Sequence, residues 1–199
     1  RVQLYLFPTI IIFYSVEIRF QYFFNNINIY ILICKMTLKY AIDCEMVGCV
    51  NGNCLARISI VNQLGCLVLD EYVKPTAVVI DYRNMATDIK KKYLENGSDI
   101  ATVRRKVRDL LNGCILIGHF LKFDLEALNL SHPENKQRDL AVYEPFMMKY
   151  NYLPVALKTL ARDILGRTIQ EDEHDSVEDA KACMAIYLKV TSEWEKHYV

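Results

Sequence analysis

The chain lacks the features that mark several classes of protein. Its seven cysteines are an odd number without a CxxC pair, which does not suit a disulfide framework or a zinc finger. We therefore expect reduced thiols, as in cytosolic or nuclear proteins, and keep a zinc site as the alternative. The 199 residues carry 24 basic and 24 acidic side chains, so no overall basic field points to a nucleic-acid partner.

Long uncharged runs are also missing. The two longest, residues 2–16 and 20–34, hold 15 residues each, whereas a membrane-spanning helix needs about 20. No small-residue cleavage site follows them, so a signal peptide fits poorly. We expect no membrane association.

Residues 1–35 nevertheless differ from the rest of the chain. They are rich in Ile, Phe, Tyr and Asn and show no clean helical or strand period. A non-native leader is favoured because these residues use AT-rich codons and Met36 directly precedes the first clear strand. A genuine N-terminal extension and a membrane or targeting segment are the alternatives. We predict that residues 1–35 lie outside the fold and that residues 36–199 form one domain.

The remainder alternates between strand-like and helix-like patterns. Three strands are expected first, joined by turn residues into an antiparallel meander: Lys39–Met46, Leu55–Asn62 and Cys66–Tyr72. Helices and one short buried strand follow: helices at 84–94, 100–111, 121–130, 155–165 and 176–194, and the strand at 115–117. This order predicts an α/β fold in which helices flank one mixed sheet.

Acidic residues occur at three distant places in this framework. Asp43 and Glu45 are two apart on a strand and therefore share one face, and Asp124 lies in the first turns of a helix. His174 and Asp179 bracket the start of the last helix, where Ser176 is a candidate N-cap. Taken singly, each acid has a structural explanation, such as a solvated strand end or a helix cap.

Taken together, the acids predict a metal site. Carboxylates in apolar surroundings repel one another and resist desolvation, so a cluster of them needs cations. Hard ions such as Mg²⁺ or Mn²⁺ prefer oxygen ligands, and a pair of them suits phosphodiester hydrolysis. A histidine that titrates near neutral pH suits the role of general base.

These three blocks resemble the three motifs of the DEDDh 3′→5′ exonucleases, a branch of the RNase H-like fold. Further segments are similar to the RNA exonuclease 4 and interferon-stimulated exonuclease subgroup: AIDCEMVG at 41–48, LARISIVN at 55–62, YVKP at 72–75, DYR at 81–83, RD at 138–139, LKTLA at 157–161 and SVEDA at 176–180. The resemblance covers residues 39–194, and the string DCEMVG is its most specific part.

The resemblance implies an RNase H-like fold with a mixed five-stranded sheet. It implies that four carboxylates hold two Mg²⁺ (or Mn²⁺) ions, that a histidine acts as base, and that two further residues hold the terminal nucleotide. The four carboxylates are those of Asp43, Glu45, Asp124 and Asp179, and the base is His174. The residues that hold the terminal nucleotide are Met46 and Arg83.

The implied activity is that of a 3′→5′ exoribonuclease. It would act as a monomer on single-stranded RNA 3′ ends, or on DNA, and release nucleoside monophosphates. The subgroup further implies rRNA processing and a nuclear, nucleolar location, with the cytoplasm as the alternative.

Several positions depart from the subgroup. Phe123 stands where an Asn is usual, and Asp175 replaces a Ser after the histidine. Thr87-Asp88-Ile89 replaces Ser-Gly-Ile, and the loop Cys49–Cys54 is shorter. None of these differences removes a presumed metal ligand, but together they affect substrate preference and the nucleotide pocket. Two alternatives stay open: an exonuclease that prefers DNA or short oligonucleotides, and an inactive nucleic-acid-binding homologue, which loss of a ligand would favour. The basic runs at 90–92 and 104–108 form either a solvated face or a track for phosphates.

Overall fold

The structure of this chain is a computed structural model that describes residues 38–83, 87, 89–171 and 173–198, with the side chains of His197 and Tyr198 excepted. By their internal contacts the residues divide into 1–37 and 38–199, and only the second unit lies within the described part. The prediction that residues 1–35 lie outside the fold concerns residues that are not described, and it stays a prediction.

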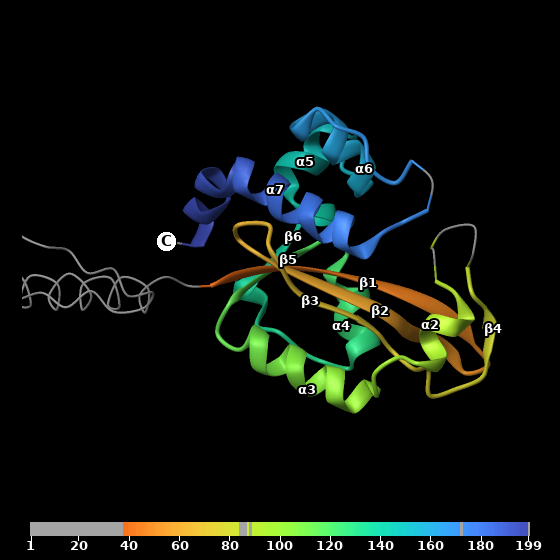
Figure 1. Cartoon of the computed structure of the whole chain (residues 1–199). Helices are drawn as coiled ribbons and strands as arrows, with labels where there is room; N and C mark the ends of the chain where they lie inside the picture. Colours follow the sequence, from red (N-terminus) through yellow and green to blue (C-terminus); the bar gives the residue numbers. More distant parts are fainter. Residues whose placement is uncertain (1–37, 84–86, 88, 172, 199) are drawn as a thin grey trace, which may run out of the picture. The chain divides into compact units, whose positions relative to one another are not determined.

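A mixed sheet forms the centre of the second unit (Figure 1). Its strands are β1 (Lys39–Cys49), β2 (Gly52–Asn62), β3 (Leu67–Tyr72), β4 (Val79–Asp81), β5 (Ile115–Gly118) and β6 (Gln137–Asp139). The order is β3-β2-β1-β5-β6, and β4 pairs with the far end of β1. The expected meander of β1, β2 and β3 is confirmed, and β5 lies parallel to β1.

The sheet has six strands rather than the five that the resemblance implies. The pattern of residues identified neither β4 nor β6. Each has only three residues, which is too short for an alternation of apolar and polar side chains to be recognised. Their pairing with β1 and β5 is decided by the neighbouring strands, so only the folded chain shows it.

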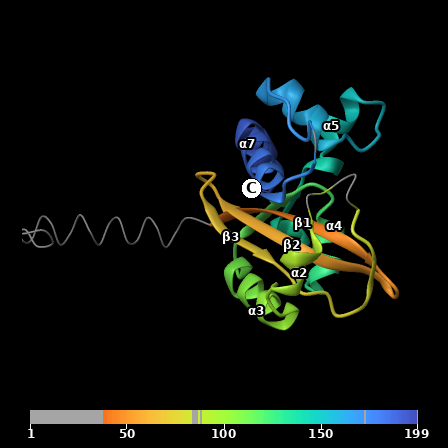
Figure 2. The same ribbon diagram turned by 45° about the vertical axis from the view of Figure 1, so that its right-hand side comes forward.

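Helices cover both faces of this sheet. They are α2 (Lys91–Glu95), α3 (Ile100–Leu111), α4 (Leu121–Leu128), α5 (Glu144–Lys149), α6 (Leu157–Leu160) and α7 (Ser176–Trp194). Short helical turns complete the described elements: η1 (Glu134–Lys136), η2 (Leu140–Val142), η3 (Ala161–Leu165) and η4 (Glu195–Tyr198). Figures 1 and 2 show α7, α5 and α6 on one side of the sheet and α3 and α4 on the other.

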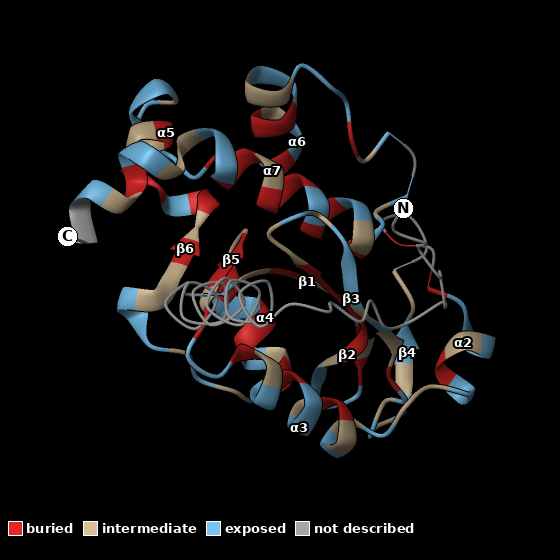
Figure 3. Ribbon diagram, turned by 60° about the vertical axis from the view of Figure 1, so that its left-hand side comes forward, coloured by how far each residue is buried: buried red, intermediate tan, exposed pale blue. Residues whose placement is uncertain are grey.

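Each face has its own apolar core (Figure 3). On the α7 side, Ala41 and Ile117 of the sheet pack with the inner face of α7. On the α3 side, Ile42 and Leu116 pack with α3 and α4. Neighbouring residues of β1 and β5 thus point to opposite faces, as the alternation of side chains along a strand requires.

Two of the expected helices are wrong in part. In the segment 84–94 the helix is limited to α2, because Thr87 forms a parallel β-bridge with His174 and Lys90 is extended. Residues 84–86 and 88 lie outside the described residues. The segment 155–165 is divided into α6 and the π-helical η3, and α5 lies where irregular structure was expected.

A buried ion pair joins the end of the sheet to the end of α7. Arg138 of β6 is 2% exposed and donates from Nε and Nη2 to the two carboxylate oxygens of Glu195, at 2.8 and 2.7 Å. The hydroxyl of Tyr187 donates to the same carboxylate at 2.8 Å. A buried arginine needs such a partner, because an unpaired charge resists desolvation.

Two further expectations concern the cysteines and the membrane. Six of the seven cysteines lie in the described residues and all six are free thiols, in agreement with the expected reduced state: Cys44, Cys49, Cys54, Cys66, Cys114 and Cys183. In the part of the chain that the structure describes, the helices fall short of the length and apolar character that a membrane span needs.

Candidate active site

The central strand of the sheet presents two of the predicted acids. Asp43 and Glu45 lie in the middle of β1, on the same face, and Glu45 is 6% exposed while Asp43 is partly buried. Cys44, between them, packs against the apolar core on the α3 side. The expected alternation is therefore confirmed, and both carboxylates lie on the face that α7 covers.

The third acid comes from the turn between β5 and α4. Asp124 lies in the first turn of α4 and is 4% exposed. The helix begins after Phe120, whose backbone is left-handed with φ 60°. Asp139 of β6 holds this turn in place, since its two carboxylate oxygens accept the N–H groups of Phe120 and Leu121 at 2.8 and 2.9 Å.

Asp139 was not recognised as a functional residue from the sequence, although it belongs to the Arg138-Asp139 pair in the resemblance. Its carboxylate orients the helix that carries Asp124, and its charge also raises the pKa of that acid. The sequence does not show this role, because β6 has only three residues and its pairing with β5, which brings Asp139 to the start of α4, is visible only in the folded chain.

The fourth acid and the histidine meet at the start of α7. Asp179 is 2% exposed and accepts a hydrogen bond on Oδ2 from Gln170 Nε2 at 2.6 Å. Within the described residues, its Oδ1 is buried without a hydrogen-bond partner. Nδ1 of His174 lies 3.7 Å from Asp179 Oδ2. No signal in the sequence identified Gln170, whose left-handed backbone (φ 56°) turns its amide towards Asp179.

The helix cap differs from the expectation. Asp175, and not Ser176, is the N-cap of α7, because its carboxylate accepts the N–H of Val177 at 2.8 Å. The hydroxyl of Ser176 is instead buried and lies 2.7 Å from the hydroxyl of Ser59 on β2. The first turn of α7 is therefore hydrogen-bonded to the sheet.

An arginine of β2 strengthens this attachment. Arg57 is 7% exposed and donates from Nε and Nη2 to Asp70 of β3 at 2.8 and 2.9 Å. Its Nη1 lies 3.3 Å from Oδ1 of Asp175, and Asp70 also accepts the hydroxyl of Ser59 at 3.0 Å. We call Arg57, Ser59, Asp70, Asp175 and Ser176 the α7 anchor.

Burial and neighbouring negative charges raise the pKa of three of the acids. Burial raises the pKa of Asp43 well above its usual range, and the charges of Asp124, Asp179 and Glu45 raise it further. Burial also raises the pKa of Asp124 to about 7, although hydrogen bonds from Cys44 act in the opposite direction. For Asp179, burial raises the pKa to about 6, against the hydrogen bond from Gln170. Acids from β1, α4 and α7 thus share one electrostatic environment.

This environment fits divalent cations. Within the described residues, no three His, Cys, Asp or Glu side chains already form a group that could hold a metal ion. The unpartnered Oδ1 of Asp179 and the raised pKa values of three acids both indicate missing positive charge. An all-oxygen donor set suits Mg²⁺ or Mn²⁺.

The histidine is suited to accept a proton. Its side chain is 44% exposed, and partial burial, followed by the charge of Lys158, lowers the pKa of His174 below its usual value of 6.5. The imidazole is therefore neutral at neutral pH, which is the form that a general base requires.

The two residues assigned to the terminal nucleotide lie at the far end of β1. Met46 follows a register shift in β1 and pairs with Leu55 of β2. Arg83 has a left-handed backbone (φ 53°), and its Nη2 donates to Oδ1 of Asn53, near the start of β2, at 2.5 Å. Their contact with a nucleotide stays a prediction.

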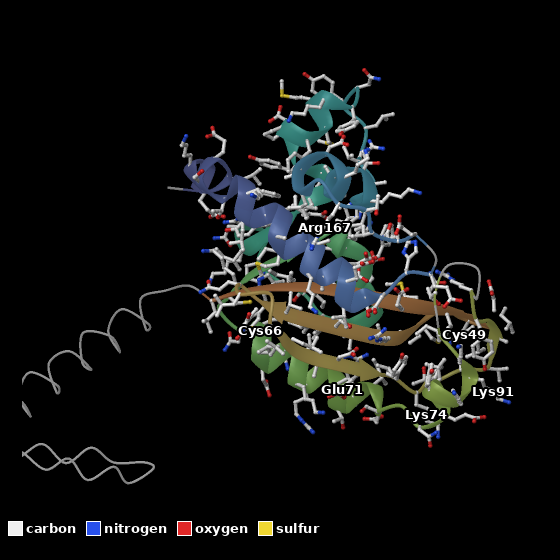
Figure 4. All side chains as sticks on the ribbon, turned by 45° about the horizontal axis from the view of Figure 1, so that its top comes forward. Cys49, Cys66, Glu71, Lys74, Lys91 and Arg167 are labelled. Carbon is white, nitrogen blue, oxygen red and sulfur yellow. The ribbon has the colours of Figure 1, made fainter. Side chains whose placement is uncertain are left out.

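The basic runs are partly used within the fold. Lys106 of α3 forms an ion pair of 2.6 Å with Glu71 of β3, which is labelled in Figure 4. Arg104 donates from Nε to the carbonyl of Leu128 at 2.5 Å, and Lys91 lies 3.6 Å from Glu95 on the same helix. These contacts give several of the cations a structural role.

Comparison with known proteins identifies the family of this chain. Residues 40–187 match the exonuclease family RNase_T. The chain is similar to RNA exonuclease 4 of Homo sapiens, with 42% identity over 163 residues, and to RNA exonuclease 4 of Saccharomyces cerevisiae, with 46% identity over 163 residues. These matches cover 80% and 79% of this chain but 39% and 56% of the relatives, so the chain spans about half the length of these curated proteins.

Solved structures show the same fold. The catalytic unit of Pan2 from Neurospora crassa matches with a TM-score of 0.71 and 27% identity, over 80% of this chain and 28% of that one. The Pan2 module of Saccharomyces cerevisiae in complex with AAUUAA RNA matches with a TM-score of 0.70 and 31% identity, over 81% and 30%. The fold is therefore RNase H-like, and the chain belongs to the RNase_T exonuclease family.

Proposed function

We propose that this exonuclease is a metal-dependent 3′→5′ exoribonuclease of the DEDDh type that releases nucleoside monophosphates. The observation that carries the proposal is that β1, α4 and α7 bring buried acids together, close enough for the charges of Asp124 and Asp179 to act on Asp43. RNA is the proposed substrate because the curated relatives are RNA exonucleases and a Pan2 neighbour was solved with RNA.

Asp43, Glu45, Asp124 and Asp179 would hold two Mg²⁺ or Mn²⁺ ions. When bound, such ions lower the pKa of an attacking water and stabilise the departing 3′ oxygen. The Nδ1 edge of His174 lies towards Asp179, which leaves Nε2 as the atom that accepts the water's proton. Met46 and Arg83 would hold the terminal nucleotide.

The α7 anchor supports this assignment because it restricts the positions of His174 and Asp179. Asp179 donates its N–H to the carbonyl of Asp175 at 2.9 Å, and Asp175 is tied to the sheet through Arg57. His174 is joined to Thr87 by the β-bridge. A backbone held on both sides of this helix start reduces the reorganisation that the reaction requires of Asp179 and His174.

The test is hydrolysis of a 5′-labelled single-stranded RNA in Mg²⁺ by the native chain and by Asp43→Asn. We expect the substitution to lower the rate at least about a hundredfold, because a metal ligand contributes several kcal/mol to the transition state. Asp109→Asn is the matched control, since it makes the same change at an exposed position of α3. Undiminished hydrolysis by Asp43→Asn would show that the site is assigned wrongly.

The same assay decides the preferred substrate. RNA and DNA of one sequence, each with a 3′-hydroxyl or a 3′-phosphate end, separate an exoribonuclease from an enzyme that prefers DNA. Binding without hydrolysis of any of the four would favour the inactive homologue. Because the chain resembles the RNA exonuclease 4 subgroup, we further propose that it acts as a monomer in rRNA processing in the nucleus. Fractionation of cells that express the native protein tests the location.

A further inference from the structure

The buried acid of α7 receives a hydrogen bond from outside its own helix. Asp179 is 2% exposed, and its Oδ2 accepts the amide Nε2 of Gln170 at 2.6 Å. The bond is short for an N–H donor, as expected where the acceptor carries a charge. An amide donates without bringing a positive charge of its own, so the carboxylate keeps its full charge for a cation.

The backbone of Gln170 is held in an uncommon conformation. Its φ of 56° lies in the left-handed region, which costs free energy for a residue other than glycine. Ile169, directly before it, is 4% exposed and belongs to the apolar core on the α7 side. The N–H of Gln170 donates to Oε2 of Glu178 on α7 at 3.2 Å. A buried neighbour and a bond to α7 thus maintain the strained backbone from which the amide reaches Asp179.

The two carboxylate oxygens of Asp179 have different surroundings. Oδ2 accepts the amide of Gln170, and Nδ1 of His174 lies 3.7 Å from the same oxygen. Oδ1 is buried and has no hydrogen-bond partner among the described residues. A buried acceptor without a partner is costly, and a bound ion is one of the few explanations for it in a native protein. Oδ1 is therefore the oxygen that is left for a metal ion.

We propose that Gln170 is a positioning residue for the metal site: it occupies Oδ2 of Asp179 and thereby fixes Oδ1 as the single oxygen with which this acid binds a metal ion. The inference rests on the proposed function, because it takes Asp179 as a metal ligand. Gln170 acts through Asp179 and needs no contact with metal or RNA. Without its amide the carboxylate can rotate about the Cβ–Cγ bond, and the ion then meets a ligand without a fixed orientation.

Such a role affects the identity of the metal ion as well as its affinity. Hydrogen-bond partners that orient a metal ligand typically contribute about 10- to 100-fold to metal affinity or activity. Mg²⁺ requires near-ideal octahedral coordination, whereas the larger Mn²⁺ tolerates a less regular set of ligands. Loss of the orienting amide should therefore impair Mg²⁺ more than Mn²⁺.

Gln170→Met tests this role, because methionine has nearly the length of glutamine but no amide donor. Gln137→Met is the matched control: the amide of Gln137 on β6 also donates one hydrogen bond, at 2.7 Å, but to the backbone carbonyl of His132 rather than to an acid. Gln170→Gly is a second variant that removes the amide and also relieves the left-handed backbone. It separates loss of the hydrogen bond from loss of stability, and thermal unfolding in EDTA shows that each variant is folded.

The first measurement is Mn²⁺ binding to the whole chain without RNA, followed by electron paramagnetic resonance of the free ion. We expect Gln170→Met and Gln170→Gly to bind Mn²⁺ about tenfold more weakly than the native chain, and Gln137→Met to bind it as the native chain does. The second measurement is the rate of RNA hydrolysis at saturating Mg²⁺ and at saturating Mn²⁺. The ratio of the Mg²⁺ rate to the Mn²⁺ rate should fall in both Gln170 variants and stay unchanged in the control.

The outcomes separate this inference from the proposed function. Native Mn²⁺ affinity in both Gln170 variants would overturn the inference, and so would an unchanged ratio of the two rates or an equal effect of Gln137→Met. In each of these cases hydrolysis that is sensitive to Asp43→Asn would leave the exonuclease assignment intact. Mn²⁺ binding that depends on Gln170, in a native chain that hydrolyses no RNA, would sustain the inference and contradict the assignment. A native chain that binds no Mn²⁺ would overturn both.

Discussion

A substitution that removes one of the site's acids should stabilise the metal-free protein. Asp124 is 4% exposed, and its pKa of about 7 compares with an ordinary value of 3.8. At about 1.4 kcal/mol per pH unit, this difference corresponds to about 4 kcal/mol of stability that the native chain gives up when Asp124 ionises.

The sign follows from the direction of the shift. A carboxyl whose pKa is raised on folding binds its proton more tightly in the folded chain than in the unfolded chain. Its destabilising effect is therefore absent below about pH 4, grows as the pH rises, and is complete above about pH 7. From pH 5 to pH 8 the metal-free native chain should lose about 3 kcal/mol through Asp124 alone.

Asp124→Asn has no charge to lose. The amide keeps one acceptor for the hydrogen bonds from Cys44 but still buries a polar group, so we expect a net gain of about 1–3 kcal/mol at pH 8. Such a gain raises the melting temperature by about 2–4 °C per kcal/mol in a chain of this size. The substitution should also lower the pKa of Asp43, because the charge of Asp124 is one of the causes that raise it.

Urea unfolding in EDTA at pH 5 and pH 8, followed by circular dichroism, measures both effects. Asp109→Asn is the control, and we expect it to change stability by less than about 0.5 kcal/mol. Addition of Mg²⁺ at pH 8 should stabilise the native chain more than the variant, since the variant lacks one ligand. A variant less stable than the native chain at pH 8 in EDTA, or a native stability that does not fall between pH 5 and pH 8, would refute the electrostatic argument.

Two further predictions concern the histidine and the α7 anchor. Because the pKa of His174 is lowered below 6.5, the rate of hydrolysis should rise with pH only below about 6.5 and then level off. His174→Gln should lower the rate and remove this rise. An unchanged dependence of the rate on pH in the variant would exclude the histidine as base. Arg57→Met should destabilise the chain by about 3 kcal/mol by leaving Asp70 unpaired, and should raise the Mg²⁺ concentration needed for half-maximal activity, with Arg57→Lys intermediate. Loss of stability without any change in Mg²⁺ dependence would limit Arg57 to a structural role.

Most of the sheet could be predicted because its signals are local. β1, β2 and β3 are rich in apolar side chains and are joined by turn residues. Each strand therefore pairs with the strand next to it in the sequence, as the local pattern predicts. The short elements β4, β6 and α5 carry no such period, and the segment around Thr87 pairs with a residue 87 positions later in the chain. Contacts of that length are decided by the packing of the whole domain.

The acids could be predicted from the sequence because Asp43 and Glu45, two apart on a strand, must share a face, and because the three blocks resemble the motifs of a known family. Residues that hold these acids were harder to find. Asp139, Gln170 and Arg57 act through hydrogen bonds that cross from one element to another, and the residue types alone do not distinguish them from ordinary surface side chains.

The sequence by itself determined the α/β class and the family resemblance and predicted the set of acids, because these depend on residue types and on periods within single elements. Only the tertiary structure decided that Asp175 rather than Ser176 caps α7, that Arg57 ties this cap to the sheet, and that acids from α4 and α7 raise the pKa of Asp43 on β1. The reason is physical: charge interaction and hydrogen bonding depend on distance in space and on burial, which a linear order of residues does not contain.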